Sequence, residues 1–417
     1  MKLSPLAHDL YDEIAELEII DAHEHLPTET EYLSFGYSGL NLFANYLQGD
    51  LRSAGLDAEF IAKMRDDVTT PVDVWWPKVK PAWEAVQHTS YARALRVTAR
   101  DYFGIDVIND DTIGELAEKV QADNTPGLYR RVLQEKCNLR LSITCLDDSN
   151  VPTDPHFRGI TRLPNFRQTG RALIDQIASQ SSREVRTLDD AVEAMQLRLR
   201  ADVAAGAVGF KMVAQDLGMP DPSAAEAAFA EALGSPDDAR PRPALRDYLF
   251  DKALDVAAET RVPVAVHTGY WGDFRTIDVK FMLGFAMRRS DVHFDMFHLG
   301  MPEYREAMLI AKTLPNVSLN LCWCAIISQV QLKRSLDELI DLVPSNKVIA
   351  FGGDYRVAVQ KTHCHLVLAR EVVASVLAKR ITAGDFDRAE AMRLARLWFT
   401  DNPTRIYRLD ASSRRSG

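Results

Sequence analysis

The chain has 417 residues, 47% of them hydrophobic and 26% charged, which is the balance of an ordinary globular protein. Its formal net charge of −10 would repel nucleic acid on average, so no nucleic-acid partner is expected. No run of about 18 apolar residues occurs, so no membrane span and no membrane partner are expected either. The N-terminal residues carry acidic side chains where a signal peptide would be apolar, and we therefore expect a cytoplasmic location.

Short apolar runs rich in β-branched residues alternate with amphipathic helical patterns along the chain. Eight such runs occur, at 17–22, 139–146, 159–163, 208–213, 262–267, 292–298, 317–322 and 347–351. Helical patterns lie between the later ones, at 188–205, 224–231, 245–260, 302–314 and 334–342, with Pro302 in the first turn of the fourth.

Strands that alternate with helices predict a parallel sheet, and eight units predict an α/β fold closed into a (β/α)8 TIM barrel. A doubly wound open sheet is the alternative, but it would want a glycine-rich G-x-G-x-x-G turn after an early strand, and none occurs.

The chain is longer than the usual ~250 residues of such a barrel, and the excess is concentrated in two places. Residues 27–138, between the first two runs, are rich in helix formers and aromatic residues, which predicts a helical insertion after strand one. Because loops that follow barrel strands rise above the catalytic face, this insertion should cap that face. Two extra helices are expected from His363 to about Pro403, all within one domain spanning residues 1–417.

Polar side chains stand at or near the C-terminal ends of five predicted strands. They are His23 and His25 after strand one, Lys211 in strand four, His267 after strand five, His298 after strand six and Asp354 after strand eight. Alternation along a strand puts His23 and His25 on one side, with Ala22 and Glu24 on the other, and two adjacent imidazoles can bind one metal ion. Barrel enzymes carry their chemistry at these strand ends.

Taken singly, each of these residues has an ordinary structural interpretation. Lys211 could extend to solvent, His267 or His298 could be a hydrogen-bonded core histidine, and Asp354 could cap a helix or a turn. Their joint position at strand ends makes a metal site the better interpretation.

In order and spacing, these residues resemble the amidohydrolase superfamily, and most closely its amidohydrolase-related branch with one metal. The resemblance covers residues 17–30 and 138–410. It implies that His23, His25 and His267 are imidazole ligands and that Asp354 is both a ligand and a proton shuttle. It also implies that His298 orients water or substrate beside the metal, and that Lys211 polarises the substrate or is carboxylated to bridge two metals.

The insertion is similar, more weakly, to the uronate isomerase branch of the same superfamily. The segments that carry this likeness are WWPKVKPAWEAV, ARDYFGID and ITCLDDSN. This likeness implies the same metal site, but it leaves the choice between hydrolysis and isomerisation open.

A metal with an open position lowers the pKa of bound water towards ~7, a carboxylate accepts the proton, and a nearby imidazole or Lys211 stabilises charge on a carbonyl oxygen. These parts suit a metal-dependent hydrolase of an ester, lactone or amide bond in a small polar substrate. Nitrogen ligands with one carboxylate favour zinc, with manganese next.

The same parts could serve a sugar-acid isomerase or a non-oxidative decarboxylase, and a barrel retained for binding without catalysis is a third hypothesis. Substrate contacts are expected from two loop segments, through Trp271 and Arg275 and through Tyr355 and Arg356, although each could equally be loop packing. The partner is a small-molecule substrate, and association of identical chains is compatible with the sequence.

Two further motifs predict no metal site. Cys322 and Cys324 would share one side of a strand, but no second C-x2-C pair accompanies them, so buried reduced thiols are expected. His363 and His365 begin a helical stretch, in which residues two apart point to nearly opposite faces.

Overall fold

The computed structural model describes residues 2–146, 154–168, 170–235 and 240–409. Eight parallel strands form one sheet in chain order, as the sequence predicts. They are β1 (Ile19–Glu24), β2 (Leu139–Leu146), β3 (Phe157–Arg162), β4 (Gly209–Val213), β5 (Val264–His267), β6 (Phe294–Phe297), β7 (Val317–Asn320) and β8 (Val348–Ile349).

The segment after β8 meets β1 and brings the ends of the sheet together. Ala22 N–H donates to the carbonyl oxygen of Phe351 at 3.1 Å, and Asp354 N–H donates to that of His23 at 2.8 Å. His25 N–H donates to the carbonyl oxygen of Tyr355 at 2.9 Å. The TIM barrel is therefore confirmed, with its seam at the candidate site.

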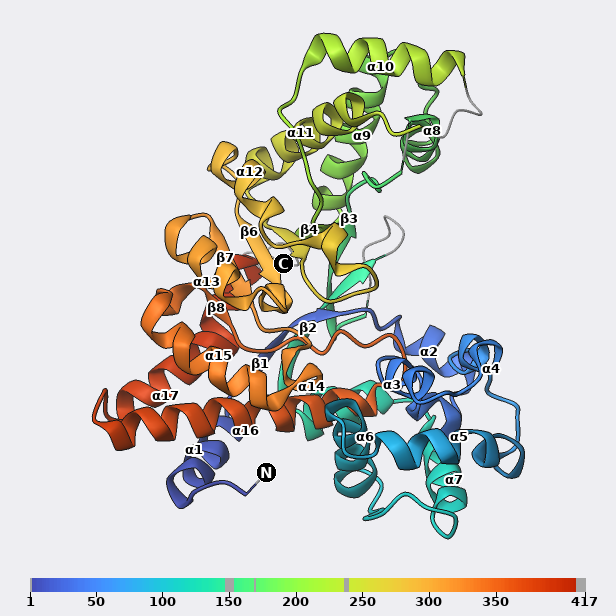
Figure 1. Ribbon diagram of the computed structural model, residues 1–417, viewed down its shortest axis with the longest axis vertical. Helices are drawn as coiled ribbons and strands as arrows, with labels where there is room; N and C mark the ends of the chain where they lie inside the picture. The colour runs from blue at the N-terminus through green and yellow to red at the C-terminus, as the bar shows by residue number, and fades with distance from the viewer. Residues whose placement is uncertain (1, 147–153, 169, 236–239, 410–417) are drawn as a thin grey trace.

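Helices cover the outside of the barrel (Figure 1). The barrel helices are α1 (Pro5–Ala15), α8 (Gly170–Ser181), α9 (Leu188–Ala204), α10 (Pro222–Gly234), α11 (Pro243–Thr260), η3 (Phe274–Ile277), α12 (Phe281–Arg288), η4 (His298–Gly300), α13 (Tyr304–Thr313), α14 (Cys324–Ile327), α15 (Gln329–Leu342) and η5 (Ser345–Lys347). The five predicted helices correspond to α9, α10, α11, α13 and α15. Among the described residues, no helix has the length and apolarity that crossing a membrane requires.

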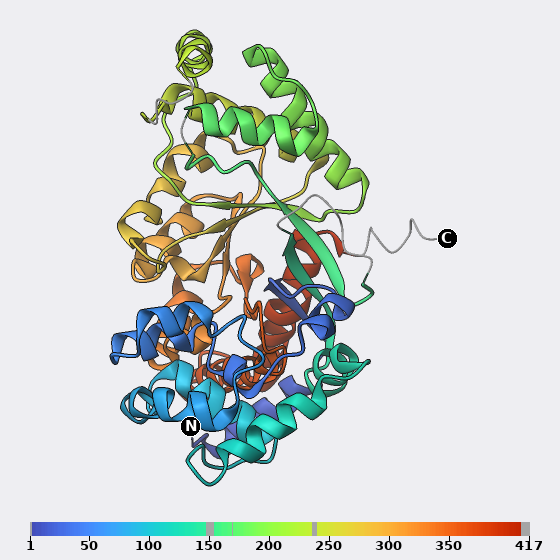
Figure 2. The same ribbon diagram turned by 90° about the vertical axis from the view of Figure 1, so that its right-hand side faces the viewer.

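Between β1 and β2 the chain forms the predicted helical insertion. Its helices are α2 (Glu29–Phe35), η1 (Gly39–Leu42), α3 (Leu47–Ser53), α4 (Ala58–Lys63), α5 (Val72–Val86), α6 (Ser90–Asp101), α7 (Ile113–Asp123) and η2 (Arg130–Lys136). They gather at the end of the molecule opposite α8–α11 (Figures 1 and 2). The insertion packs on the long C-terminal helix α16 through α6. Part of the segment ITCLDDSN lies outside the described residues.

The C-terminal helices also form, and they extend beyond the prediction. They are α16 (Gln360–Ala383), α17 (Arg388–Arg396), η6 (Leu397–Asp401) and α18 (Asn402–Ile406). Ile406, Tyr407 and Leu409 join the hydrophobic cluster that contains Ile20, Ile143 and Ile349 from the strands. The end of the chain therefore contributes to the core inside the sheet.

Two local predictions are wrong in detail. Pro302 precedes its helix, because left-handed residues at 298–300 turn the chain first and α13 begins at Tyr304. Cys322 and Cys324 do not share a strand face, because β7 ends at Asn320 and left-handed Trp323 starts α14. All five cysteines are buried and form no disulfide among the described residues, as expected.

His293, just before β6, gives the fold a pH-dependent contribution to stability. Burial, and then the charges of Arg405 and Lys347, lower its pKa from 6.5 to about 4. The folded chain keeps this imidazole neutral down to about pH 4, whereas the unfolded chain protonates it below about pH 6.5. The free energy of unfolding should therefore fall as the pH drops through this window.

We expect His293→Gln to remove this part of the acid sensitivity, since glutamine does not titrate and can still reach Ser318 Oγ. Denaturant titrations at pH 7 and pH 5 measure the free energy of unfolding of both proteins. The value for the variant minus that for the wild type should be higher at pH 5 than at pH 7 by on the order of 1–2 kcal/mol. A constant difference between the two proteins would contradict this assignment.

Candidate metal centre

The six strand-end residues come together at the C-terminal mouth of the barrel. His23 and His267 belong to β1 and β5, His25 and His298 follow β1 and β6 directly, and Lys211 lies in β4. Asp354 lies five residues beyond the end of β8 and has a left-handed φ of 61°. Since parallel strands end at the same edge, residues far apart in sequence converge here.

Two imidazoles converge on one carboxylate oxygen. His23 Nε2 and His25 Nε2 each lie 3.4 Å from Asp354 Oδ1. One potential ligand atom from each of His23, His25 and Asp354 lies within 4.8 Å of the other two. The residues His298, Cys322 and Asp354 form a second such group, which shares the same carboxylate.

His267 lies in neither group and is positioned through His298. His298 Nδ1 donates to the Cys322 carbonyl oxygen at 3.0 Å, so in the neutral ring Nε2 carries the lone pair. That nitrogen lies 2.9 Å from His267 Nδ1, which must then be the donor. The remaining lone pair is on His267 Nε2, a buried atom with no hydrogen-bond partner in the described part of the chain. Its role as a ligand stays a prediction.

Burial keeps these imidazoles neutral, which is the form that binds metals. It lowers the pKa of His23, His25 and His267 well below the usual range, and that of His298 to about 3. Burial also raises the pKa of Asp354 to about 6, against the opposing effect of Lys211.

Lys211 does not extend to solvent. Its side chain is 3% exposed, and Nζ lies 3.4 Å from His23 Nε2 and 3.7 Å above the centre of the Phe297 ring. Burial lowers the pKa of this amine to about 8. A buried cation therefore lies next to His23 Nε2, the nitrogen that faces Asp354.

These residues fit a divalent metal. Neutral imidazole nitrogens and one carboxylate are typical zinc donors. His23 Nε2 and His25 Nε2 converge on Asp354 Oδ1, and His267 Nε2 is buried without a hydrogen-bond partner among the described residues. His23, His25 and Asp354 would hold the ion, and His267 Nε2 is the candidate fourth donor.

The two glycines before Asp354 are required by close packing. A Cβ atom on Gly353 would lie 1.9 Å from Glu24 Oε1, and one on Gly352 would lie 2.8 Å from Cys322 Cβ. Gly353 N–H donates to Asp21 Oδ1, and Tyr355 N–H donates to Glu24 Oε2. Buried carboxyls on β1 thereby fix the loop that carries Asp354.

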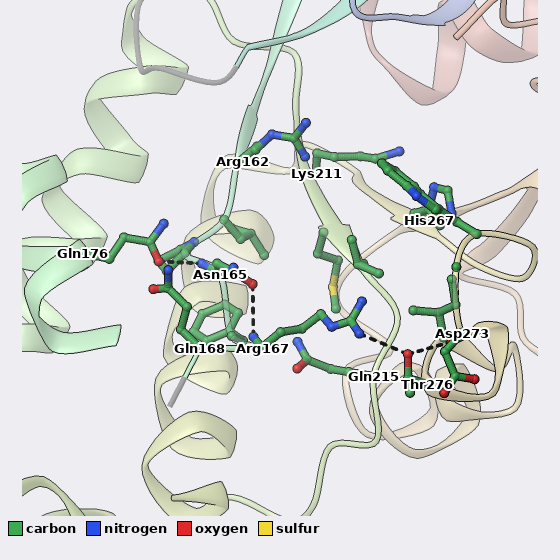
Figure 3. A pocket seen from close by; sticks show the side chains of 18 residues that line it. Arg162, Asn165, Arg167, Gln168, Gln176, Lys211, Gln215, His267, Asp273 and Thr276 are labelled. Atoms are coloured by element: carbon green, nitrogen blue, oxygen red, sulfur yellow. Dashed lines mark hydrogen bonds between the residues drawn. The ribbon is translucent and has the colours of Figure 1, made fainter. Parts of the chain in front are cut away.

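Two cavities meet at this centre. The inner cavity, about 570 Å³, is lined by His25, Asp354 and Arg356 together with residues of the insertion, among them Tyr46 and Arg65. The distal cavity, about 780 Å³, lies beside Lys211 and the loops after β3, β4 and β5 (Figure 3). Arg162, His267, Trp271 and Gly272 line both.

The proposed substrate residues are distributed differently around these cavities. Trp271 is 66% exposed and lines both, and Arg356 lines the inner one. Arg275 pairs with Asp273 and lines a separate outer cavity further from the imidazoles. Tyr355 is fully buried and lines neither the inner nor the distal cavity.

Sequence reasoning missed Arg162, Tyr46, Arg65 and Trp323 as lining residues of the inner cavity. Arg162 could have been found, because it ends β3 just as the other polar residues end their strands. Tyr46 donates a hydrogen bond to the carbonyl oxygen of Asp354. Tyr46 and Arg65 both come from the insertion; the sequence predicts that the insertion caps the catalytic face, but no local pattern shows which of its residues reach the cavity.

We expect Gly353→Ala to destabilise the chain and weaken metal binding, because the added methyl group must displace the Glu24 carboxyl. A loss of about 1–3 kcal/mol is typical of such overpacking. Gly114→Ala is the matched control, since a Cβ there meets nothing within 4 Å and the site lies inside α7. Thermal unfolding should show a drop for the first variant alone, and equal behaviour would contradict the packing account.

We further expect purified protein to hold about one divalent metal ion per chain and His23→Ala to lose it. Elemental analysis of native protein measures this directly. His8→Ala, at an exposed histidine paired with Asp12, should keep the metal. A wild-type chain that neither contains nor takes up metal would contradict the site.

Comparison with known proteins places these features in context. The amidohydrolase family profile matches residues 157–409. Among curated proteins, none matches the sequence.

Solved structures match over nearly the whole chain. Uronate isomerase from Thermotoga maritima has a TM-score of 0.80 at 16% identity, covering 97% of this chain and 98% of its own. Glucuronate isomerase from Caulobacter crescentus has a TM-score of 0.80 at 18% identity, covering 97% and 94%. A Lactobacillus casei protein, provisionally assigned as a metal-dependent hydrolase, has a TM-score of 0.67 at 15% identity, covering 97% and 98%. At these identities the likeness concerns the fold.

Proposed function

This chain belongs to the amidohydrolase family, and we propose that it is a metal-dependent enzyme that interconverts the aldose and ketose forms of a sugar acid. The observation that carries the proposal is one cavity whose wall contains the Asp354 carboxyl together with the guanidinium groups of Arg162 and Arg356. The sequence alone favours hydrolysis, because Arg162 is brought to the metal ligands and to Arg356 only when the chain folds.

Charge in the inner cavity favours an anionic substrate. Arg65, Arg162 and Arg356 line it, against the one carboxyl of Asp354 among its described lining residues, and Arg65 is partly neutralised by its pair with Asp66. In a chain with a net charge of −10, this cationic wall is a local exception. Guanidinium groups bind carboxylates through paired, charge-assisted hydrogen bonds, so the carboxylate of a sugar acid suits this wall.

Isomerisation moves one hydrogen to the aldehyde carbon from its neighbour and one proton between their oxygens, with no water consumed. Asp354 lies at the mouth of the barrel and can accept a hydroxyl proton and return it. The phenol of Tyr46, which donates to the Asp354 backbone carbonyl, fixes the loop that presents this carboxylate. Trp271 and Trp323 supply apolar walls that limit water around the reacting carbons.

Zinc is the metal that we propose first, with manganese second, held by His23, His25 and Asp354 with His267 as the candidate fourth ligand. When bound, such an ion supplies positive charge next to the carbonyl and hydroxyl oxygens of the substrate. Lys211 is buried next to His23 Nε2 and adds to this positive potential.

The comparisons support this proposal through the insertion as well as the barrel. Both isomerase structures match 97% of this chain, so the match extends over nearly all of the insertion, whose turns contribute Tyr46 and Arg65. A barrel match alone would support any member of the family.

Hydrolysis of an ester, lactone or amide bond is the second candidate, and Lys211 and His298 favour it. His298 Nε2 lies 3.9 Å from Asp354 Oδ2, and Lys211 lines the distal cavity. The Lys211 cation could stabilise the oxyanion formed when water attacks a carbonyl, and His298 holds His267 in place beside the carboxylate. Non-oxidative decarboxylation of an aromatic acid would use the same groups.

We expect the metal-loaded protein to convert a hexuronate into the corresponding ketose, and Asp354→Asn to lower kcat by about 10²–10⁴-fold. Ketose formation in a panel of uronates, followed by nuclear magnetic resonance, measures this. The matched control is Asp12→Asn, at an exposed aspartate on α1, which should keep full activity.

A parallel panel of esters, lactones, amides and aromatic acids separates the alternatives. Turnover in that panel without any ketose formation would overturn the isomerase proposal in favour of hydrolysis or, if CO2 is released, decarboxylation.

A further inference from the structure

The distal cavity continues outwards, away from the metal centre. It shares Phe166, Arg167, Gln168, Gln215 and Thr276 with an outer cavity of about 450 Å³ at the starts of α11 and α12. Because neighbouring cavities share wall residues, the inner, distal and outer cavities adjoin in a row, here called the path, that leads outwards from the imidazoles. Figure 3 shows the middle of this path, with Lys211 and His267 at one side and Arg167 directed towards Thr276.

This path is too long for the proposed substrate alone. Cavities of roughly 300–1,000 Å³ accommodate drug-sized ligands. The inner cavity, about 570 Å³, is by itself sufficient for a six-carbon acid, and the distal cavity adds about 780 Å³. The additional space suits a second unit attached to the part of the substrate that lies away from the metal centre.

Cationic side chains dominate the outer part of the path. Four arginines line the outer cavity, Arg167, Arg242, Arg246 and Arg275, against one carboxyl, that of Asp216. Arg242, Arg246 and Arg275 are partly neutralised by Glu231, Asp247 and Asp273. Arg167, which lines both cavities, donates to the neutral hydroxyl of Thr276 at 3.0 Å. The Asp273 carboxylate acts on Arg167 only at longer range and is itself paired with Arg275, so part of the Arg167 charge remains for a ligand in either cavity.

Amide side chains between the cations suit hydroxyl groups. Asn165, Gln168, Gln176 and Gln215 line the distal cavity. Gln176 Oε1 accepts from Asn165 N–H, and Asn165 Oδ1 accepts from Arg167 N–H, which orders this wall. Amides alternating with guanidinium groups offer donors and acceptors to a ligand with many hydroxyls and repeated carboxylates.

We propose that the distal and outer cavities form a subsite for further sugar-acid units, so that the substrate is the reducing end of a short oligomer of uronic acids. This inference rests on the proposed function, because isomerisation requires the free aldehyde carbon at the metal centre. Because the reacting unit is then open-chain, the oligomer must continue from a hydroxyl-bearing carbon away from the aldehyde, along the path past Trp271 and Arg167. The monomer is the minimal substrate, and each added unit brings one more carboxylate to the arginines.

Direct binding tests the subsite without turnover. Calorimetric titration of the metal-loaded full chain should show the 1,4-linked dimer of galacturonic acid binding at least about tenfold more tightly than the monomer. A neutral disaccharide of the same length should bind no more tightly than the neutral monosaccharide. In Arg167→Gln the preference for the acidic dimer should fall about three- to tenfold. Equal affinity for dimer and monomer, or an unchanged preference in this variant, would overturn the subsite.

The matched control is Arg305→Gln, which removes an exposed arginine on α13 paired with Glu338, and it should keep the full preference for the dimer. A loss in this variant equal to that in Arg167→Gln would attribute the preference to overall charge and overturn the subsite.

The same ligands distinguish this inference from the proposed function. Tight, Arg167-dependent dimer binding without ketose formation supports the subsite and overturns the isomerase. Ketose formation from the monomer, with no gain for the dimer in binding or in KM, supports the isomerase and overturns the subsite.

Discussion

The candidate site depends on the way β1 and the segment after β8 bring the two ends of the sheet together. Backbone hydrogen bonds join Ala22 to Phe351, His23 to Asp354 and His25 to Tyr355. They place the Asp354 carboxylate between two imidazoles that are more than 300 residues earlier in the chain. The same contacts that complete the barrel therefore create the ligand cluster, so its geometry is as rigid as the fold.

Burial then decides the chemistry of the cluster. Desolvation favours neutral imidazoles, because charging a buried group costs free energy. Two more buried carboxyls, Asp21 and Glu24, fix the backbone behind the ligands. Burial raises the pKa of both, and for Glu24 the neighbouring Asp21 raises it further. Charge is thus minimised around the centre, whereas the cavities beyond it are strongly cationic.

Much of this could be predicted from sequence, because each element has a local signal. Apolar runs located all eight strands, and polar residues at strand ends located His23, His25 and Asp354, which the structure brings together. The pairing of His298 with His267 could not be predicted, since it depends on a left-handed turn at 298–299. Tyr46 and Arg65 were missed because they reach the site through the docking of the insertion, which depends on long-range contacts.

The most direct test of this account is a crystal structure of metal-loaded protein with anomalous data collected at the metal absorption edge. The account predicts one strong peak within bonding distance of His23 Nε2, His25 Nε2 and an Asp354 carboxylate oxygen. A metal bound elsewhere, or these three side chains lying apart with no peak between them, would contradict it.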